Sequence, residues 1–335
     1  EECAQLTSDW NDLHAASQSR DPFLLPEWYE SWFQHSPEKS SGHILAVYQR
    51  GALSGVLPII VKESWQLGFR ARLASHLLRG PADSEQFLAR SNDPAILTFA
   101  ATQLFDTDPW DVLMLGEVPA DSSIFTWVAE LKAHGFHPVL SPHSVCPYLV
   151  VEGSSSECWR RIYPERGRRS KRKSLVNRLH SLQNASFFTE KDYPQFDALF
   201  DDIVAVEQAS WKKSAAGSLT CIEWRSRFYR SAFSALCRNR ALRFDLIKIG
   251  GRPAAFSVGV KASGTLLFYQ TSYDPAFAQV SPGYAVTMTM IERFHDEGGT
   301  EIDLGRGVYG YKNELNTRAR QNYMVLVFRS RFQHD

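Results

Sequence analysis

The chain has 335 residues, of which 44% are hydrophobic and 22% are charged, and its formal net charge is +0. This composition is that of an ordinary globular protein and excludes a disordered or fibrous one, and the length suits two domains. A zero net charge also excludes a whole-protein field that attracts nucleic acid, so any basic binding site must be local.

Cysteine usage and hydropathy predict a soluble protein of a reducing compartment. The five cysteines are widely spaced and form no C-x-x-C pair, which argues against a disulfide framework and against a zinc or other metal site. They are Cys3, Cys146, Cys158, Cys221 and Cys237. No apolar run approaches the roughly 20 residues that span a bilayer, and the first residues lack a signal-peptide core. We therefore expect a cytoplasmic protein.

Helices and strands alternate in the first 151 residues. The expected elements are helices at 10–17 and 26–33, a hairpin of strands at 43–49 and 53–61, a strand at 111–115 and a helix at 122–134. The hairpin turns at Arg50-Gly51, because glycine adopts the backbone angles that tight turns require. Gly135 ends the last helix as a C-cap residue. This order is typical of a mixed α/β layer.

The second half repeats a similar order after a small, polar stretch at 152–156, which is the best linker candidate. The expected elements are a basic helix at 170–183, a strand at 185–189, helices at 193–209 and 222–238, strands at 242–249, 253–261 and 265–273, a helix at 283–297, and strands at 301–304 and 323–329. Glycine-bearing turns join the three central strands into a meander. We therefore expect two domains, 1–151 and 157–335, of α/β class with α+β mixed sheets.

The junction before the helix at 283–297 is a candidate phosphate site. The first N–H groups of a helix lack intrahelical acceptors and carry a partial positive charge, so phosphates bind there. A pantetheine–pyrophosphate donor needs such a cradle, and a plain capped helix start is the alternative. The candidate residues are Gln279, Val280, Ser281, Gly283, Tyr284 and Ala285.

Chemically active residues follow the strand at 301–304, in Ile302-Asp303-Leu304-Gly305-Arg306-Gly307, then Tyr309 and Tyr311-Lys312. Ligands usually meet an α/β sheet at the C-terminal ends of its strands. Asp303 could accept a proton from an amine, and Tyr311 could protonate a departing thiolate. Arg306 and Lys312 are candidates for donor binding. The alternative is a glycine turn with a structural Asp–Arg pair.

A carboxylate precedes a tryptophan by four residues near the end of the helix at 193–209. This spacing places Glu207 and Trp211 on one helix face. Glu207 could act as a base whose pKa is raised if Trp211 shields it, and Trp211 is a substrate-binding candidate. A solvated Glu207 beside a core Trp211 is the alternative.

A basic run from Arg166 to Arg178, which leads into this basic helix, contains seven cationic residues and no acidic one. It could be a phosphate clamp for a donor, a site for an anionic substrate, a surface for nucleic acid or membrane, or a solvated helix face. Arg168, Arg169 and Arg172 are the candidate binding residues. Nucleic acid is the less favoured partner, because the net charge is zero and no RNA-binding motif accompanies the run.

Taken together, these motifs resemble the GNAT-superfamily branch that includes the CelD-like acyltransferases of cellulose biosynthesis and is related to the FemAB aminoacyltransferases. The likeness covers nearly the whole chain and rests on the order and spacing of several short motifs. They are Pro22-Phe23, Pro26-Glu27-Trp28, Leu57-Pro58, the basic helix from Arg168, Ser210-Trp211-Lys212, Gly251-Arg252-Pro253-Ala254-Ala255, Ser281-Pro282-Gly283, Asp303-Leu304-Gly305-Arg306-Gly307 and Tyr311-Lys312.

The resemblance implies tandem GNAT-like acyltransferase folds, with the first domain structural or on the acceptor side. It implies an acyl-CoA or acyl-carrier-protein donor, no metal, and direct transfer to a small-molecule amine, an amino sugar or a long-chain lipid amine. Residues 281–285 would match the pyrophosphate loop, although Val280 stands where that loop usually has Gln or Arg. The strand at 268–272, with Tyr269 and Gln270 as substrate-binding candidates, would supply the N–H that polarises the carbonyl.

Two other functions remain open. A FemAB-like transferase would use aminoacyl-tRNA and bind it through the basic helix, although the sequence lacks the helical arm that such enzymes often carry. A catalytically silent binding module in polysaccharide or lipid assembly is the third hypothesis. Peripheral contact with the inner membrane is compatible with each of the three.

Overall fold

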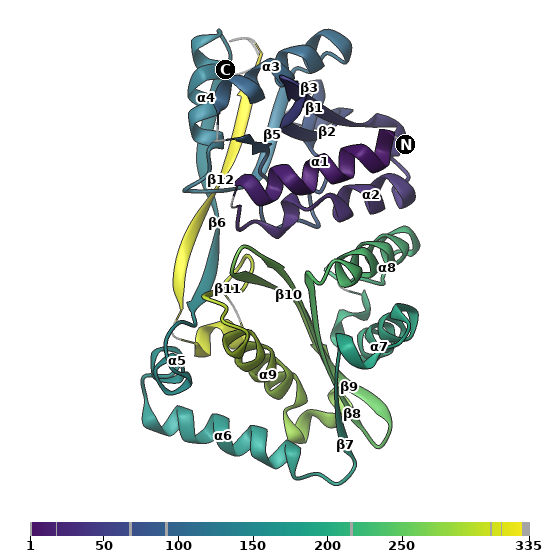
Figure 1. Ribbon diagram of the computed structural model, residues 1–335, viewed down its shortest axis with the longest axis vertical. Helices are drawn as coiled ribbons and strands as arrows, with labels where there is room; N and C mark the ends of the chain where they lie inside the picture. Colours follow the sequence, from purple (N-terminus) through teal and green to yellow (C-terminus); the bar gives the residue numbers. More distant parts are fainter. Residues whose placement is uncertain are drawn as a thin grey trace. The chain divides into compact units, whose positions relative to one another are not determined.

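The chain folds into two compact units, one formed by Glu1–Val145 with Arg320–Asp335 and the other by Cys146–Ala319. The structure is a computed structural model that describes residues 2–17, 19–66, 69–90, 93–214, 217–308, 310–315 and 317–329. Each unit is a mixed sheet with helices packed on it (Figure 1). We call them unit 1 and unit 2.

Unit 1 is built on a sheet of order β1-β2-β3-β5-β12-β6, in which β3 and β5 run parallel. Its elements are α1 (Glu2–Ser17), α2 (Pro26–His35), β1 (Gly42–Gln49), β2 (Ala52–Gln66), β3 (Phe69–His76), β4 (Leu88–Ala89), α3 (Pro94–Thr107), β5 (Val112–Pro119), α4 (Ile124–Ala133), β6 (His137–Val150) and β12 (Arg318–Phe328). Residues 146–150 of β6 belong to unit 2.

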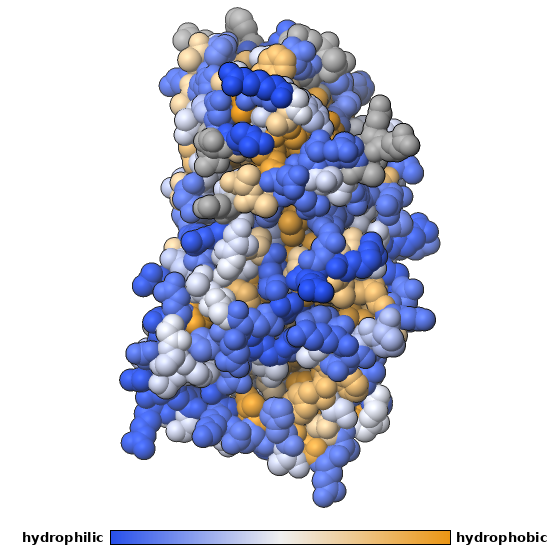
Figure 2. Space-filling model, viewed as in Figure 1, coloured by the Kyte–Doolittle hydropathy of each residue, from blue (hydrophilic) through white to orange (hydrophobic). Residues whose placement is uncertain are grey.

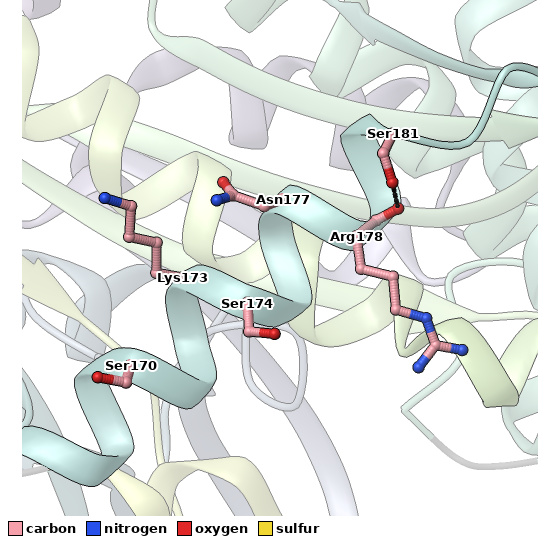
Figure 3. A pocket seen from close by; sticks show the side chains of 6 residues that line it. All are labelled: Ser170, Lys173, Ser174, Asn177, Arg178 and Ser181. Carbon is pink, nitrogen blue, oxygen red and sulfur yellow. Dashed lines mark hydrogen bonds between the residues drawn. The ribbon is translucent and has the colours of Figure 1, made fainter.

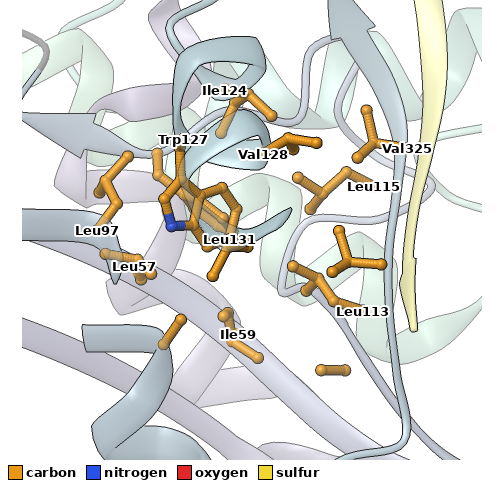
Figure 4. Close-up of a cluster of buried hydrophobic side chains, with 14 of the residues drawn as sticks. Leu57, Ile59, Leu97, Leu113, Leu115, Ile124, Trp127, Val128, Leu131 and Val325 are labelled. Carbon is orange, nitrogen blue, oxygen red and sulfur yellow. The ribbon is translucent and has the colours of Figure 1, made fainter. Parts of the chain in front are cut away.

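The core of unit 1 lies between the sheet and helices α3 and α4. Trp127 of α4 is fully buried and packs its ring edge on Phe87. Around it lie Leu57, Ile59, Leu97, Leu113, Leu115, Ile124, Val128, Leu131 and Val325 (Figure 4). Val325 comes from β12, whose residues Asn322–Phe328 pair with β5. The last strand of the chain therefore completes the sheet of unit 1.

Unit 2 is built on a sheet of order β6-β11-β10-β9-β8-β7, in which β10 and β11 run parallel. Its elements are α5 (Ser155–Ile162), α6 (Arg166–His180), β7 (Ala185–Thr189), α7 (Phe196–Ala209), α8 (Glu223–Arg238), β8 (Leu242–Ile249), β9 (Arg252–Ala262), β10 (Thr265–Tyr273), α9 (Pro282–Asp296) and β11 (Glu301–Asp303). Helices α7 and α8 cover one face of this sheet, and α5, α6 and α9 lie on the other (Figure 1).

Hairpins and capped helices were predicted best. The hairpin β1–β2 and the meander β8–β9–β10 are confirmed, and Gly135, at φ 90°, follows the end of α4. The sequence pattern did not predict β3, β4, α3, α5 or β6. The proposed linker at 152–156 instead contains the cap of α5, since the Ser154 hydroxyl accepts a hydrogen bond from the Glu157 N–H. Residues 320–329, expected in the second domain, lie in unit 1.

The face drawn in Figure 2 is mostly polar, with apolar side chains scattered among the polar ones. Among the exposed apolar residues, Trp65 is 78% and Trp211 is 67% exposed. Within the described ranges, the structure contains no helix that is both long enough and apolar enough to span a membrane.

A neutral histidine lies at the end of β3 in unit 1. His76 is fully buried, its Nδ1 accepts a hydrogen bond from the Leu78 N–H (3.3 Å), and its Nε2 lies 3.2 Å from the Tyr29 hydroxyl oxygen. The Tyr29 hydroxyl donates to the Phe23 carbonyl (2.7 Å), so Nε2 must carry the proton. Burial lowers the pKa of His76 to about 3.

We expect the free energy of unfolding to fall as the pH drops below 6.5. The unfolded chain binds a proton at His76 near pH 6.5, whereas the folded chain binds it only near about pH 3. The loss therefore approaches about 1.4 kcal/mol per pH unit within that window. Urea unfolding between pH 6.5 and about pH 5 measures the slope, which His76→Gln should reduce. The exposed control His134→Gln should retain it, and an equal slope in both variants would contradict the prediction.

Candidate active site in unit 2

The two parallel strands of unit 2 diverge after three paired residues. Thr265, Leu266 and Leu267 of β10 pair with Glu301, Ile302 and Asp303, and β11 ends there while β10 continues to Tyr273. A bulge follows at once, because Phe268 pairs with Gly259 but Gln270 pairs with Val258. Tyr269 is thus an extra residue that interrupts the β10–β9 ladder.

The bulge turns two consecutive side chains toward the same helices. The Tyr269 hydroxyl lies 3.0 Å from that of Tyr229 on α8. Gln270 accepts a hydrogen bond from Lys212 and donates one to the Gly217 carbonyl (3.3 Å). In a regular strand these neighbours would point to opposite faces, so the bulge gathers polar groups beside α7 and α8.

Unit 1 has the corresponding divergence, but its own chain fills it. Pairing of β3 with β5 ends at Ser75 and Met114. Beyond that point the Glu85 N–H donates to the Glu117 carbonyl (2.8 Å), and the Glu85 carboxylate accepts from the Gly116 N–H (2.6 Å). The loop that contains Glu85 thus forms hydrogen bonds with the backbone groups of β5 next to the point where the strands diverge.

The segment after β11 lies beside the bulge in unit 2. The Asp303 carboxylate accepts from the Gly305 N–H (2.7 Å), which fixes the turn. The Tyr311 ring packs edge-on against Phe268, with centroids 6.0 Å apart. Lys312 is only 6% exposed and donates to the carbonyls of Gly305 (3.3 Å) and Arg306 (3.0 Å).

This arrangement brings Asp303 and Tyr311 into one short segment that follows the divergence. Arg306 is partly buried, and Lys312 holds the turn instead of extending into solvent. Tyr309, which was part of the same motif, lies outside the described residues.

The start of α9 is shaped by protein packing. Ser281 has a left-handed backbone (φ 53°), and its N–H donates to the Ala278 carbonyl (3.0 Å). A Cβ at Gly283 would come within 2.9 Å of the Tyr273 ring, so glycine is required there by Tyr273. Tyr284 bonds through its hydroxyl to that of Tyr163 (2.9 Å).

The other donor candidates divide between solvent and core. Gln279 is exposed and its carbonyl accepts from Arg178 (3.2 Å), Val280 packs on the core cluster near α9, and Ala285 is buried. Of the predicted phosphate cradle, the structure therefore offers the first-turn N–H groups of Gly283 and Tyr284 beside an exposed loop.

Glu207 and Trp211 fit neither the shielded pair nor a solvated Glu207 beside a core Trp211. Glu207 is fully buried, and its carboxylate accepts from the Ser218 hydroxyl (2.7 Å), the Leu219 N–H (3.0 Å) and the Thr220 hydroxyl (3.0 Å). Trp211 is exposed, so it does not shield this carboxylate. These contacts fix the loop at 217–220 to the end of α7, so we call Glu207 a structural bracket for this loop.

Lys212 belongs to the motif Ser210-Trp211-Lys212 but was not predicted to be a site residue. It follows Trp211 in the short 3-10 helix Trp211–Ser214, and its Nζ donates to Gln270 on the bulged strand. Burial lowers the pKa of Lys212 to about 8; the Glu207 carboxylate opposes this shift and the Lys312 ammonium adds to it. A charge buried beside a strand bulge cannot be read from local sequence.

The candidate arginines of α6 make contacts inside unit 2. Arg168 pairs with Glu165 (3.3 Å), and Arg169 donates to the Tyr163 carbonyl (2.6 Å). Arg172 stacks on Trp159, 3.6 Å from the ring centroid, and pairs with Glu292 (2.5 Å). These three side chains anchor the helix more than they offer charge to a ligand.

The outer face of α6 carries a different set of polar groups. An open pocket of about 620 Å³ lies along it (Figure 3). Its lining residues are Ser170, Lys173, Ser174, Asn177, Arg178 and Ser181. Among the described residues, no group of three or more His, Cys, Asp or Glu side chains could hold a metal ion.

Residues 166–313 match the family model described as "Acetyltransferase (GNAT) domain". The matched residues lie within unit 2. The matched residues include the diverging pair, the start of α9 and the segment with Asp303 and Tyr311. A comparison with curated proteins finds no significant match.

Solved structures share the fold along the whole chain. FemX aligns with a TM-score of 0.64 at 12% identity, over 94% of this chain and 95% of that one. The C-terminal domain of a protein from Agrobacterium fabrum, named as a putative lysylphosphatidylglycerol synthetase, aligns with a TM-score of 0.61 at 8% identity. The alignment covers 96% of this chain and 91% of that one. L-PGS from Bacillus licheniformis aligns with a TM-score of 0.56 at 10% identity, over 92% of this chain and 93% of that one. The predicted fold class, mixed α/β with GNAT-like units, is confirmed.

If Glu207 is a structural bracket, Glu207→Ala should lower the free energy of unfolding by about 2–4 kcal/mol, because buried donors lose their acceptor. Urea unfolding measures this loss. Glu223→Ala, which removes an exposed carboxylate paired with Arg227, should stay within about 0.5 kcal/mol of the wild type. A stable Glu207→Ala protein that has lost only activity would show a base instead of a bracket.

Proposed function

We propose that the protein is an N-acyltransferase that moves an acyl group from an acyl thioester to a primary amine at the divergence of β10 and β11. The observation that carries this proposal is the bulge at Tyr269, directly beyond the last parallel pair, Leu267 and Asp303. A diverging strand leaves backbone N–H groups that can polarise a carbonyl. Unit 1, whose divergence is filled by Glu85, is assigned a structural or acceptor-side role.

The chemistry follows as a direct attack. The amine nitrogen bonds to the thioester carbon, and the carbon–sulfur bond breaks after collapse of the tetrahedral intermediate. Asp303, oriented by the Gly305 N–H, takes the proton that the amine loses, directly or through a water molecule. Tyr311, held beside the strand by Phe268, gives a proton to the leaving thiolate.

The donor in this proposal is acyl-CoA or an acyl-carrier protein. The N–H groups that open α9 at Gly283 and Tyr284 would hold its phosphates, and Arg306 would contribute charge from the segment after β11. The acceptor belongs to lipid or amino-sugar chemistry, as the resemblance to CelD-like acyltransferases suggests. We place the reaction in the cytoplasm, where peripheral contact with the inner membrane would give access to a lipid amine.

An aminoacyl-tRNA-dependent transferase is the second candidate. The fold similarity to FemX and to proteins named as lysylphosphatidylglycerol synthetases supports it. The exposed outer face of α6 adds Lys173 and Arg178 beside hydroxyl and amide groups, a combination that suits phosphate backbones. Retention of tRNA that weakens steeply with salt would favour this candidate over acyl-CoA.

Tyr311→Phe tests the proposed reaction. We expect purified wild-type protein to be stabilised against heating by a long-chain acyl-CoA in a saturable way and to acylate an amine. The variant should bind the donor equally well but turn over about 10²–10⁴-fold more slowly, because the general acid is lost. Tyr273→Phe, which changes an exposed tyrosine of β10, is the matched control.

Failure of the wild type to bind any acyl-CoA or acyl-carrier protein would overturn the thioester donor. Full turnover in Tyr311→Phe would overturn the role of the phenol alone. A protein that binds the donor and never transfers the acyl group would instead be a binding module.

A further inference from the structure

A stripe of cations and small polar side chains runs along the outer face of α6. Arg166 begins it, and the six residues that line the open pocket continue it to Ser181 at steps of three and four residues (Figure 3). Residues with this spacing lie on one helix face, and all of them are exposed. At a rise of about 1.5 Å per residue, the cations Arg166, Lys173 and Arg178 cover about 18 Å of the helix. We call this surface the α6 stripe.

The positive charge of the α6 stripe is open to solvent. Arg166, Lys173 and Arg178 take part in no ion pair among the described residues, and α6 itself contains no acidic residue. The carboxylates that contact this helix pair with its other cations, Arg168 and Arg172. A local excess of exposed charge of one sign steers a partner of the opposite sign. The α6 stripe is therefore suited to an anionic partner.

The shape of the α6 stripe suits a helix. In Figure 3 the long side chains of Lys173 and Arg178 extend on either side of Ser174, whose own side chain is short. The short side chains leave the open pocket of about 620 Å³ along the helix. The side-chain ridge of a second helix can pack into such a groove, and carboxylates on that helix would meet the flanking ammonium and guanidinium groups in charge-assisted hydrogen bonds.

The composition of the α6 stripe separates the possible anionic partners. A membrane-surface helix needs apolar side chains that enter the lipid, and surfaces for single-stranded nucleic acid use aromatic side chains on which bases stack. The stripe holds cations, hydroxyl groups and the Asn177 amide, and neither apolar nor aromatic side chains. It therefore favours an acidic protein surface over a lipid surface or an RNA.

One end of the α6 stripe adjoins the proposed donor site. Arg178 donates to the carbonyl of Gln279 (3.2 Å), which lies in the short 3-10 helix directly before α9. The first-turn N–H groups of Gly283 and Tyr284 follow within the next five residues. A partner that lies along the stripe would thus be close to the start of α9.

We propose that an acidic helix of an acyl-carrier protein docks on the α6 stripe. The inference rests on the proposed function, because it names the donor of the same site: a thioester on a carrier protein instead of free acyl-CoA. The carrier holds its acyl group on a phosphopantetheine arm. Docking beside Gln279 would bring the phosphate of that arm to the N–H groups that open α9.

Fluorescence anisotropy of a labelled bacterial acyl-carrier protein, loaded with a long-chain acyl group, tests the docking without any acyl transfer. We expect the wild type to bind it, and binding to weaken as the salt concentration rises. Arg166→Glu/Lys173→Glu should bind at least about tenfold more weakly, because like charges then face each other. Arg227→Glu/Arg238→Glu is the matched control. It makes the same change of charge at exposed positions of α8, on the opposite face of the sheet, and should bind like the wild type.

Acyl transfer to an amine supplies a second readout. We compare KM for the acyl-carrier protein with KM for acyl-CoA that holds the same acyl group. The ratio of the two should rise at least about tenfold in the α6 variant and stay at the wild-type value in the α8 variant. A merely damaged fold would affect both donors and leave the ratio unchanged. Thermal unfolding checks each variant, and Lys173→Gln replaces the double α6 variant if that protein does not fold.

Equal affinities for the carrier protein in the wild type and both variants would overturn the inference, as would a wild type that binds no acyl-carrier protein. Binding of tRNA that the α6 variant loses, without binding of the carrier protein, would overturn it in favour of the second candidate function. Acyl transfer from acyl-CoA but not from the carrier protein rejects this inference alone. Docking that depends on the α6 stripe, with no transfer from either thioester, rejects the proposed function alone.

Discussion

The site of this protein depends on one interruption of a β-ladder. Leu267 and Asp303 are the last pair between β10 and β11, and the extra residue Tyr269 prevents β10 from continuing as a regular strand. The bulge, which lies in the β10–β9 ladder, accompanies polar contacts of two neighbouring side chains: Tyr269 with Tyr229, and Gln270 with Lys212. Gly259, which pairs with Phe268, must be glycine there, because a Cβ would come within 2.7 Å of Leu266.

Unit 1 also contains two parallel strands whose pairing ends before the second strand does. In unit 1 the loop at Glu85 supplies an acceptor for the Gly116 N–H and a donor for the Glu117 carbonyl. Buried backbone groups must be paired. The loop supplies these partners, so it fills the space beside the diverging strands of unit 1. In unit 2 the segment after β11 is pinned by its own contacts, Asp303 to Gly305 and Lys312 to two carbonyls. The two units therefore differ in which loop contacts the backbone beside the diverging strands.

Charge burial separates structural from functional groups in unit 2. Arg293 joins Asp245 (2.6 Å) and Glu190 (3.0 Å) across β8 and the turn before α7. In this cluster each cation is paired with carboxylates of the protein, as buried charges require. The buried Glu207 carboxylate likewise accepts hydrogen bonds from the loop at 217–220.

The sequence alone determined the local structure. Turn glycines at 250–251 and 264, helix caps and alternating apolar residues predicted the hairpin, the meander and the long helices, because these features depend on neighbours a few residues apart. The motif from Asp303 to Lys312 was likewise visible as a run of active groups at a strand end. The same local signals failed for β6 and for the 152–156 stretch, where Ser154 caps a helix.

Only the tertiary structure decided what depends on distant parts of the chain. β12 joined unit 1 because its register with β5 buries Val325 in that core. Glu207 is fully buried and Trp211 is exposed, although the i, i+4 spacing had predicted that both lie on one helix face. Lys212 met Gln270 across 58 residues of sequence. Burial and charge balance are sums over the whole fold, so no window of sequence contains them.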